Sequence, residues 1–332
     1  MRRKSILGIG SVILCGVLLF SACGQKETYL LGTGNEAGNY YAYGNTLSEL
    51  LEQNELEVDV KKTAGSAANL RLLQKGFLDM AIVQSDTLLD AYRGKGDFLG
   101  NECTGVRAVA GLYTEECQVI VAADSDIYSI ADLYEKKVSI GEEESGVKRN
   151  AIQILDANGI KETQIVAYYL SFSDSADALK SGEIDAFFMT AGAPTVAALQ
   201  LAEKMDIRIL SLDDKTCQKL MKEYPSYTKC VIPAGTYPGQ TEDADTVGVK
   251  AVLVVGNKMP NRVVSKISEC LFANVEKLRT VDSEQVLSKE YATEAIPIPF
   301  HKGAANWYEG QGVQVSTTEV GSTGFFTGVG QD

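Results

Sequence analysis

Four short turns, rich in glycine and other small residues, each stand between a predicted strand and a predicted helix. They are Gly32 to Gly38, Gly65-Ser66, Gly141 to Gly146 and Ala191 to Pro194. The first N–H groups of a helix have no partner within it, and the helix dipole adds partial positive charge there. Each turn therefore offers donors to a carboxylate or another anionic group. One such turn is typical of a plain helix cap, whereas four at strand ends predict a ligand cleft.

Polar side chains in or near these turns would add hydrogen bonds to a ligand. The candidates are Thr33, Asn35, Ser66, Asn69, Gln84, Ser85 and Ser145. All of them are uncharged, so the pattern favours recognition by hydrogen bonds over acid–base catalysis.

Catalytic interpretations have little support in the sequence. A Ser-His-Asp triad would depend on His301, the only histidine, which we expect to be a structural or surface residue. Glu142-Glu143-Glu144 could be paired acids or a cation site, but a solvated loop is the favoured interpretation. The glycines after the first strand fall at relative positions 1, 3 and 7, which differs from the dinucleotide-binding pattern of 1, 3 and 6. We therefore expect neither an enzyme nor a cofactor site.

The cysteines do not form a metal-binding pattern. Beyond Cys15 and Cys23 they are Cys103, Cys117, Cys217, Cys230 and Cys270, with no CxxC spacing, so we expect no metal site. Cys103 with Cys117, or Cys217 with Cys230, are possible disulfides, and the spacing alone assigns neither.

Strand and helix patterns alternate along the chain and predict an α/β fold with largely parallel sheets. The predicted strands are Thr28 to Leu31, Val58 to Val60, Met80 to Val83, Val106 to Leu112, Gln118 to Ala122, Lys137 to Ile140, Ile165 to Leu170, Ala186 to Met189, Ile207 to Leu210 and Val247 to Gly256. Predicted helices include Gly146 to Asn158, and Pro194 to Met205 with the proline in the first turn.

An internal similarity divides the chain into two lobes. Leu73 to Val83 and Leu179 to Met189 each contain a helix end, a glycine, an aspartate and a buried strand, although such junctions are common in proteins of this class. We expect the strands at Gln118 to Ala123 and Val247 to Gly256 to cross between the lobes. Lobe 1 would then be residues 24–120 plus 250–332, and lobe 2 residues 121–249, with the ligand between them.

The N-terminus predicts export and a lipid anchor. Arg2, Arg3 and Lys4 precede an apolar run of about 15 residues, which is too short to span a bilayer, so residues 1–22 form a signal peptide. Ser21 and Ala22 before Cys23 form a lipobox, in which Cys23 would carry the lipid that holds the mature protein on a membrane. Ordinary cleavage that leaves a free thiol is the alternative.

The charge of the chain argues against a nucleic-acid partner. The formal net charge is −13 and becomes −16 when the three basic residues of the signal peptide are removed. Such a surface repels phosphate backbones and anionic headgroups. With 45% hydrophobic residues, the mature chain is long enough for two lobes with separate cores.

The ordered set of motifs closely resembles the TAXI family of TRAP-transporter solute receptors over nearly the whole mature chain. The motifs are Gly32-Thr33-Gly34 with Tyr40-Tyr41, Gly65-Ser66 with Asn69, Gln84-Ser85-Asp86, Ile130-Ala131-Asp132-Leu133, Val138-Ser139-Ile140-Gly141, Ser145-Gly146, Gly182 with Asp185-Ala186-Phe187-Phe188, Ile232-Pro233-Ala234-Gly235-Thr236-Tyr237 and His301-Lys302-Gly303-Ala304-Ala305.

The resemblance implies a two-lobe, type II periplasmic-binding-protein fold that closes on its ligand and docks on an ion-gradient-driven TRAP permease. It implies a receptor that catalyses nothing, works as a monomer, and binds a small organic acid or amino acid such as glutamate or 2-oxoglutarate. The ligand-binding residues would be Thr33, Gly34, Asn35, Tyr40, Ser66, Asn69, Gln84 and Ser85 from lobe 1 and Ser145, Gly146, Val147, Gly192 and Ala193 from lobe 2.

Two departures from the family pattern bear on the ligand. Val147 stands where the family usually has threonine, and Glu142 to Glu144 place negative charge where it usually has small neutral residues. They favour a zwitterionic or uncharged solute over a dicarboxylate. A stand-alone sensor or protein-binding lipoprotein is the alternative function.

Overall fold

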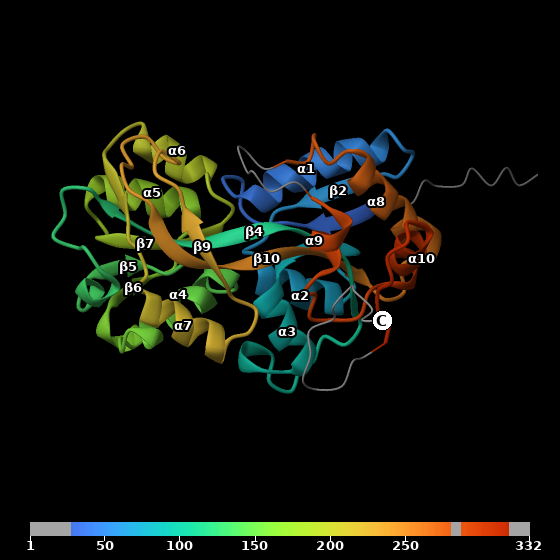
Figure 1. Ribbon diagram of the computed structural model, residues 1–332, viewed down its shortest axis with the longest axis horizontal. Coiled ribbons are helices and arrows are strands. Elements are labelled where there is room, and N and C mark those ends of the chain that lie inside the picture. The colour runs from blue at the N-terminus through green and yellow to red at the C-terminus, as the bar shows by residue number, and fades with distance from the viewer. Residues whose placement is uncertain (1–27, 280–286, 319–332) are drawn as a thin grey trace, which may run out of the picture.

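A computed structural model of the chain describes residues 28–279 and 287–318, so the predicted signal peptide and Cys23 lie outside it. The molecule has two lobes joined by two long strands in the middle (Figure 1). Each lobe has its own hydrophobic core. Along the first of these strands, the core of lobe 1 ends at Tyr113 and the core of lobe 2 begins at Cys117. The second strand changes core between Val249 and Ala251. The division at residues 120/121 and 249/250 remains a prediction: its second boundary lies at the change on the second strand, and its first lies a few residues beyond the change on the first strand.

Lobe 1 alternates short buried strands with helices. Its elements are β1 (Tyr29–Gly32), α1 (Asn39–Glu52), β2 (Val58–Lys61), α2 (Ser66–Gln74), β3 (Met80–Gln84) and α3 (Ser85–Arg93), followed near the C-terminus by α8 (Asn261–Ala273), α9 (Lys289–Thr293) and α10 (Lys302–Gly310). Helix α1 covers one face of the sheet, and α2 and α3 cover the other (Figure 1).

Lobe 2 repeats this arrangement. Its elements are β5 (Lys137–Ser139), α4 (Gly146–Ala157), β6 (Val166–Tyr168), α5 (Phe172–Ser181), β7 (Ala186–Ala191), α6 (Val196–Ala202), β8 (Ile207–Ile209), α7 (Asp214–Glu223) and β9 (Thr228–Ile232). Helices α5 and α6 lie on one face of its sheet, and α4 and α7 on the other (Figure 1).

Strands β4 (Val106–Ala122) and β10 (Ala244–Gly256) run side by side between the lobes. All strands join one sheet, with the main order β2-β1-β3-β10-β4-β7-β5-β6. The two crossing strands are antiparallel to every strand with which they pair, so the expectation of largely parallel sheets holds only for β1 with β2 and β3 and for β5 with β6 and β7. The two strands predicted between residues 106 and 122 are a single strand.

The internal similarity found in the sequence has a structural basis. The Asp79 carboxylate accepts a hydrogen bond from Leu30 N–H on β1, and the Asp185 carboxylate accepts one from Lys137 N–H at the start of β5, each at 2.8 Å. Each aspartate lies just before the third strand of its lobe and ties that strand to the first. The two junctions therefore make the same connection between strands at equivalent places in the two lobes.

Some local predictions were wrong by a few residues or missed an element. Pro194 precedes helix α6 rather than lying in its first turn, because Thr195 is the cap. Helix α7 and strand β9 were not predicted. The segment from Ile298 to His301 adds a backbone bridge to the sheet, from Phe300 to Ala108. His301 caps helix α10 by accepting a hydrogen bond from Gly303 N–H.

The cysteines of the described part of the chain are all free. Cys103 belongs to the core of lobe 1 and Cys117 to that of lobe 2, so the first of the two possible disulfides is wrong, and the second does not form either. Within residues 28–279 and 287–318, no helix is long and apolar enough to cross a membrane.

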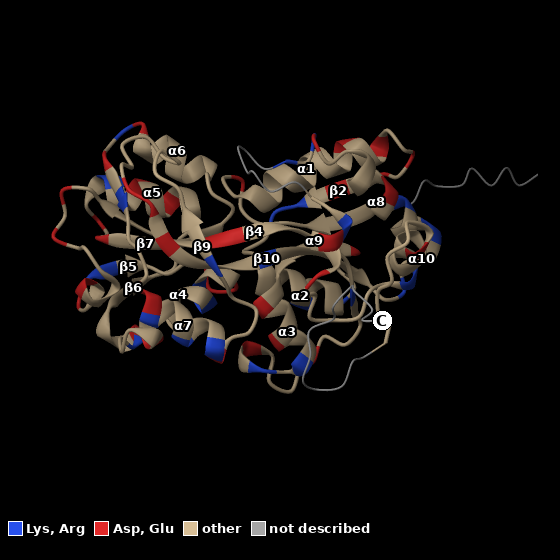
Figure 2. Cartoon of the chain, in the orientation of Figure 1, with Lys and Arg blue, Asp and Glu red and all other residues tan. Residues whose placement is uncertain are grey.

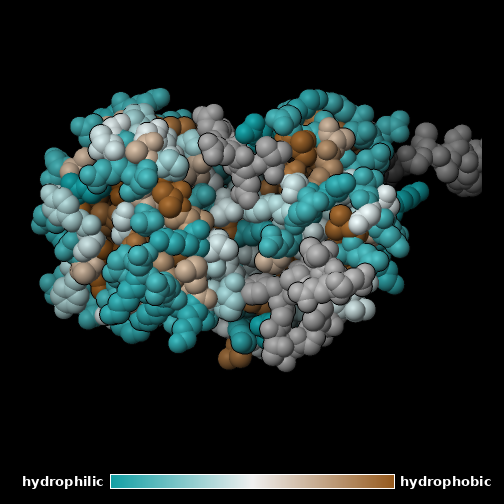
Figure 3. Space-filling model, in the orientation of Figure 1, coloured by the Kyte–Doolittle hydropathy of each residue, from teal (hydrophilic) through white to brown (hydrophobic). Residues whose placement is uncertain are grey.

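Hydrophilic side chains predominate on the face seen in Figure 3, where apolar ones show in small separate groups. Acidic residues are spread over both lobes, and β4 carries a pair of them, Glu115-Glu116, where it passes between the lobes (Figure 2).

Candidate ligand-binding site

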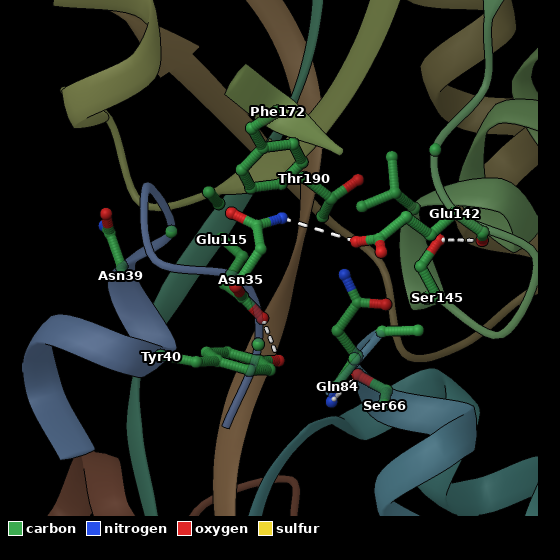
Figure 4. Close-up of a pocket in the computed structure, with 18 of the residues that line it drawn as sticks. Asn35, Asn39, Tyr40, Ser66, Gln84, Glu115, Glu142, Ser145, Phe172 and Thr190 are labelled. Carbon is green, nitrogen blue, oxygen red and sulfur yellow. Dashed lines mark hydrogen bonds between the residues drawn. The ribbon is translucent and has the colours of Figure 1, made fainter. Parts of the chain in front are cut away.

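A cavity of about 50 Å³ lies between the lobes, beside the crossing strands. Both lobes contribute to it, and Figure 4 shows the polar side chains that converge there. The lining consists of Gly34, Asn35, Gly38, Asn39, Tyr40, Ala64, Gly65, Ser66, Gln84, Glu115, Gly141, Glu142, Ser145, Gly146, Val147, Leu170, Phe172, Thr190 and Ala191.

The cavity lies where strands end and helices begin. Helices α1 and α2 of lobe 1 and α4 and α5 of lobe 2 all present their first residues to it, each after a strand of the parallel part of the sheet. In α4 the Ser145 hydroxyl caps Lys148 N–H, while the N–H groups of Gly146 and Val147 have no partner among the described residues. Three of the four predicted turns therefore contribute helix starts to this cavity, and the fourth reaches it only through Ala191.

Two glycines allow the lobes to approach closely. A Cβ atom on Gly65 would lie 3.5 Å from Cα of Ser145, and Gly65 has a φ of +123° that side chains rarely allow. A Cβ atom on Gly146 would lie 1.5 Å from Oε1 of Gln84. The loop of lobe 2 thus touches lobe 1 directly, and the structure shows the cleft in a closed state.

Glu115 of β4 is a buried carboxyl group at the cavity, with 2% of its surface exposed. It accepts a 2.6 Å hydrogen bond from the Tyr40 hydroxyl. Burial raises the pKa of Glu115 well above its usual value, and the nearby Asp86 and Glu116 add to this, against the opposing effect of Tyr40. Because a buried carboxylate without a cation is costly, the site disfavours further negative charge.

Glu142 forms the opposite wall. Its Oε2 atom accepts a 3.4 Å hydrogen bond from Nδ2 of Asn35, across the two lobes, and partial burial raises the pKa of Glu142. The expectation that Glu142 to Glu144 form only a solvated loop is therefore wrong for the first residue. Glu143 pairs with Lys148, and Glu144 pairs with Arg71 of lobe 1. The loop turns back because Ser145 donates to Glu142 O, which aims Glu142 inward.

Among the described residues, no lysine, arginine or histidine lines the cavity. Two buried side-chain oxygens at the cavity, Oδ1 of Asn35 and Oε1 of Gln84, have no hydrogen-bond partner. Buried polar atoms usually have partners, so these oxygens indicate a missing donor. No group of three or more metal-ligating side chains occurs in the part of the chain that the structure describes.

Eight of the thirteen residues predicted to bind ligand line the cavity. They are Gly34, Asn35, Tyr40, Ser66, Gln84, Ser145, Gly146 and Val147. The Ser66 hydroxyl accepts a 3.0 Å hydrogen bond from Gln84 N–H and so holds Gln84 in place at the cavity.

Three of the remaining predicted residues support the turns from behind. Thr33 donates to Lys61 O, and Asn69 bridges Thr33 O and Ile82 O through its Nδ2 atom. The hydroxyl of Ser85 accepts a hydrogen bond from Lys250 N–H of β10. Because these polar groups are used within the protein, the structure does not bring them to the cavity.

The turn after β7 reaches the cavity only at Ala191. Gly192 O accepts a 2.9 Å hydrogen bond from Asn39, and Ala193 N–H donates a 2.9 Å hydrogen bond to Glu116. Gly192 and Ala193 thus bind lobe 1 and the crossing strand instead of lining the cavity.

Sequence reasoning missed Glu115, Asn39, Leu170, Phe172 and Thr190. Glu115 lies within a strand predicted to be interrupted there, and Phe172 opens a helix that carried no glycine signal. A buried strand that contains two adjacent glutamates was the one signal that could have pointed to Glu115.

A second set of contacts joins the lobes outside the cavity. Arg149 of α4 pairs with Asp86 and Asp90 of α3, and Asn150 donates a 2.9 Å hydrogen bond to the same Asp86. Asp86 has only 2% of its surface exposed, so its charge depends on these partners. We call Arg149, Asn150, Asp86 and Asp90 the interlobe ion-pair cluster.

The sequence model of the NMT1-like family matches residues 31–312, which is most of the chain. The chain belongs to the NMT1-like family. The match includes both lobes, both crossing strands and every residue of the cavity.

Solved structures share this fold at low sequence identity. A protein from Bordetella bronchiseptica RB50 is 16% identical, with 75% of this chain and 70% of that chain covered and a TM-score of 0.50. The periplasmic aliphatic sulphonate binding protein SsuA from Escherichia coli is 15% identical, with coverage of 76% and 72% and a TM-score of 0.45. The substrate binding protein of an amino acid ABC transporter is 17% identical, with coverage of 76% and 96% and a TM-score of 0.43. The predicted α/β fold of two lobes with a cavity between them is confirmed by the structure itself.

Proposed function

We propose that this member of the NMT1-like family is an extracytoplasmic receptor that captures a small organic acid or amino acid between its lobes. The observation that carries the proposal is the cavity between the lobes, where one oxygen each of Asn35 and Gln84 and the first N–H groups of helix α4 have no hydrogen-bond partner among the described residues. Such a cavity has polar groups ready for a solute but holds no nucleophile paired with a base.

The mature chain without residues 1–23 tests this proposal in a thermal-shift screen of amino acids, organic acids, sugars and peptides. A solute at 100 times its dissociation constant stabilises the fold by about 2.7 kcal/mol. A clear rise in the unfolding midpoint for one class of solute, confirmed by calorimetric titration, is the expected result. A folded protein that none of these solutes stabilises contradicts a solute receptor and favours a protein-binding lipoprotein.

We further propose that the receptor delivers its solute to an ion-gradient-driven TRAP permease. The ordered motifs that resemble those of TAXI receptors support this proposal. Uptake of the solute by cells that carry this receptor should stop when the ion gradient is dissipated and continue while cellular ATP is lowered. The reverse dependence would indicate a transporter driven by ATP.

Attachment through a lipid on Cys23 is proposed from the lipobox alone. Cells grown with labelled palmitate should label the wild-type protein, and Cys23→Ala should abolish the label and release the protein from the membrane fraction. Unchanged labelling of the variant would show that the lipid is not attached to Cys23.

A further inference from the structure

Four polar side chains of the cavity, those of Tyr40, Ser145, Thr190 and Asn35, use hydrogen-bond donors within the protein. The Tyr40 hydroxyl donates to Glu115, the Ser145 hydroxyl to Glu142 O, and the Thr190 hydroxyl to Sγ of Cys117 at 3.6 Å. Nδ2 of Asn35 donates to Glu142. These groups therefore have little left to offer a ligand acceptor.

The acceptors of the cavity, in contrast, remain available. Oδ1 of Asn35 and Oε1 of Gln84 have no partner, and Gln84 has only 2% of its surface exposed. Glu142 accepts one long hydrogen bond, although a carboxylate offers about four lone-pair positions. Figure 4 shows Asn35, Gln84 and Glu142 close to one another around the same space.

The charge of the site also disfavours a ligand with two carboxylates. Two carboxyl groups, those of Glu115 and Glu142, are part of the lining, and no cationic side chain of the described residues belongs to it. The cations near these residues along the chain are engaged elsewhere: Lys62 with Glu36, Arg71 with Glu144, Lys148 with Glu143, and Arg149 with Asp86 and Asp90. A ligand that carries two carboxylates would therefore enter a site without a counter-charge for the second one.

We propose that the solute carries a positively charged nitrogen, held by Glu142, Asn35 and Gln84, and at most one carboxylate, held by the free N–H groups of Gly146 and Val147. This inference rests on the proposed function and narrows its ligand class to a compact amino acid without a second carboxylate. An ammonium group supplies three donors, which matches the three acceptors left open in the cavity.

The size of the cavity also favours a compact solute. A buried water needs about 10–15 Å³ of such space, so 50 Å³ accepts only a few non-hydrogen atoms unless the lobes move apart. A long side chain would hold the cleft open.

Calorimetric titration of the mature chain against the standard amino acids, and against lactate, pyruvate, succinate and 2-oxoglutarate, tests the inference. We expect an amino acid with an uncharged side chain to bind and its 2-hydroxy and 2-oxo analogues to bind about 10- to 100-fold more weakly, because each loses a charged hydrogen bond. If an organic acid without nitrogen, or a sugar, binds as well as or better than every amino acid, the inference is overturned while the receptor function stands. If no solute binds at all, both are overturned.

Paired variants test the role of Glu142 directly. Glu142→Gln should weaken binding of the amino acid found in that titration by about 10- to 100-fold and leave binding of its deaminated analogues unchanged. Glu143→Gln removes the neighbouring carboxylate, which pairs with Lys148 outside the cavity, and should change binding less than about twofold. Equal effects of the two variants, or a matching loss of binding for the deaminated analogues, contradict an ammonium contact at Glu142.

Discussion

The Tyr40 hydroxyl donates a 2.6 Å hydrogen bond to Oε2 of Glu115, which ties helix α1 of lobe 1 to a strand that crosses between the lobes. Both residues are buried and both line the cavity. A helix of lobe 1 and a crossing strand are thus linked at the cavity itself.

Replacing Tyr40 with phenylalanine leaves the buried Glu115 carboxyl group without its donor. We expect the free energy of unfolding to fall by about 1–3 kcal/mol, the usual cost of an unsatisfied buried polar group. Chemical denaturation at constant pH measures the change. Tyr41→Phe is the matched control, because Tyr41 does not line the cavity, and it should change stability by less than about 0.5 kcal/mol. Equal stability of the two variants would show that Glu115 does not depend on Tyr40.

Glu116 should make stability depend on pH. Burial raises the pKa of Glu116 from 4.5 to about 7, while the hydrogen bond from Ala193 N–H partly opposes this shift. A carboxyl group with a raised pKa in the folded state stabilises the fold fully below pH 4.5, and this contribution is lost as the pH rises towards 7. The titratable neighbours that interact with Glu116 are Glu115, Tyr113, Cys230 and Tyr237.

Unfolding curves of wild type and Glu116→Gln between pH 4.5 and 7 measure this contribution. Two and a half pKa units correspond to about 3 kcal/mol, so wild type should lose about that much more stability than the variant over the range. Glu143→Gln, on the surface, should retain the wild-type slope. A Glu116→Gln variant with the same slope would mean that other groups carry the pH dependence.

The interlobe ion-pair cluster should contribute to closure. Arg149→Met leaves the buried Asp86 with only Asn150 and the N–H and hydroxyl groups of Thr87 as donors, so we expect a loss of about 3 kcal/mol in stability and roughly tenfold weaker solute binding. Small-angle scattering without solute should show a larger radius of gyration. Lys148→Met removes an ion pair confined to lobe 2 and serves as the control.

A double-mutant cycle separates this cluster from general effects of charge. Asp86→Asn combined with Arg149→Met should be less destabilised than the sum of the two single variants, because the uncompensated buried charge is gone. Additive effects, with unchanged scattering, would exclude the cluster as a closing contact.

Gly146 should be required for full closure. An added Cβ atom would overlap Oε1 of Gln84, so Gly146→Ala either displaces the Gln84 amide from the cavity or keeps the lobes apart. We expect roughly tenfold weaker solute binding with stability within about 0.5 kcal/mol of wild type, because alanine suits the first turn of a helix. Gly310→Ala, with nothing within 4 Å of its added Cβ, is the matched control. Unchanged affinity of Gly146→Ala would contradict the closed geometry as the ligand-bound one.

Most of the strands and several cleft turns were predictable from the sequence because they depend on local patterns. Apolar runs of strand length and glycines with positive φ, such as Gly76 and Gly159, mark where strands lie and helices end. The aspartates Asp79 and Asp185 recur at equivalent places because each lobe must tie its third strand to its first.

Only the tertiary structure separated residues that face the cavity from those behind it. Asn69 and Ser66 lie three residues apart on the same helix, yet only Ser66 lines the cavity. The Nδ2 atom of Asn69 donates its hydrogen bonds to Thr33 O and Ile82 O instead. Sequence spacing places both near the turn, but the partners that other strands supply decide which one remains free.

By itself the sequence determined an α/β chain of two similar lobes with helix starts gathered at strand ends, since these follow from local periodicity and turn chemistry. The tertiary structure decided the chemistry of the cavity. Glu115 and Glu142 are 27 residues apart along the chain and come from the crossing strand and a loop of lobe 2, respectively. Their presence in one cavity, without a cationic side chain among the described residues, depends on how β4 crosses and how the lobes pack, and no local pattern encodes that long-range arrangement.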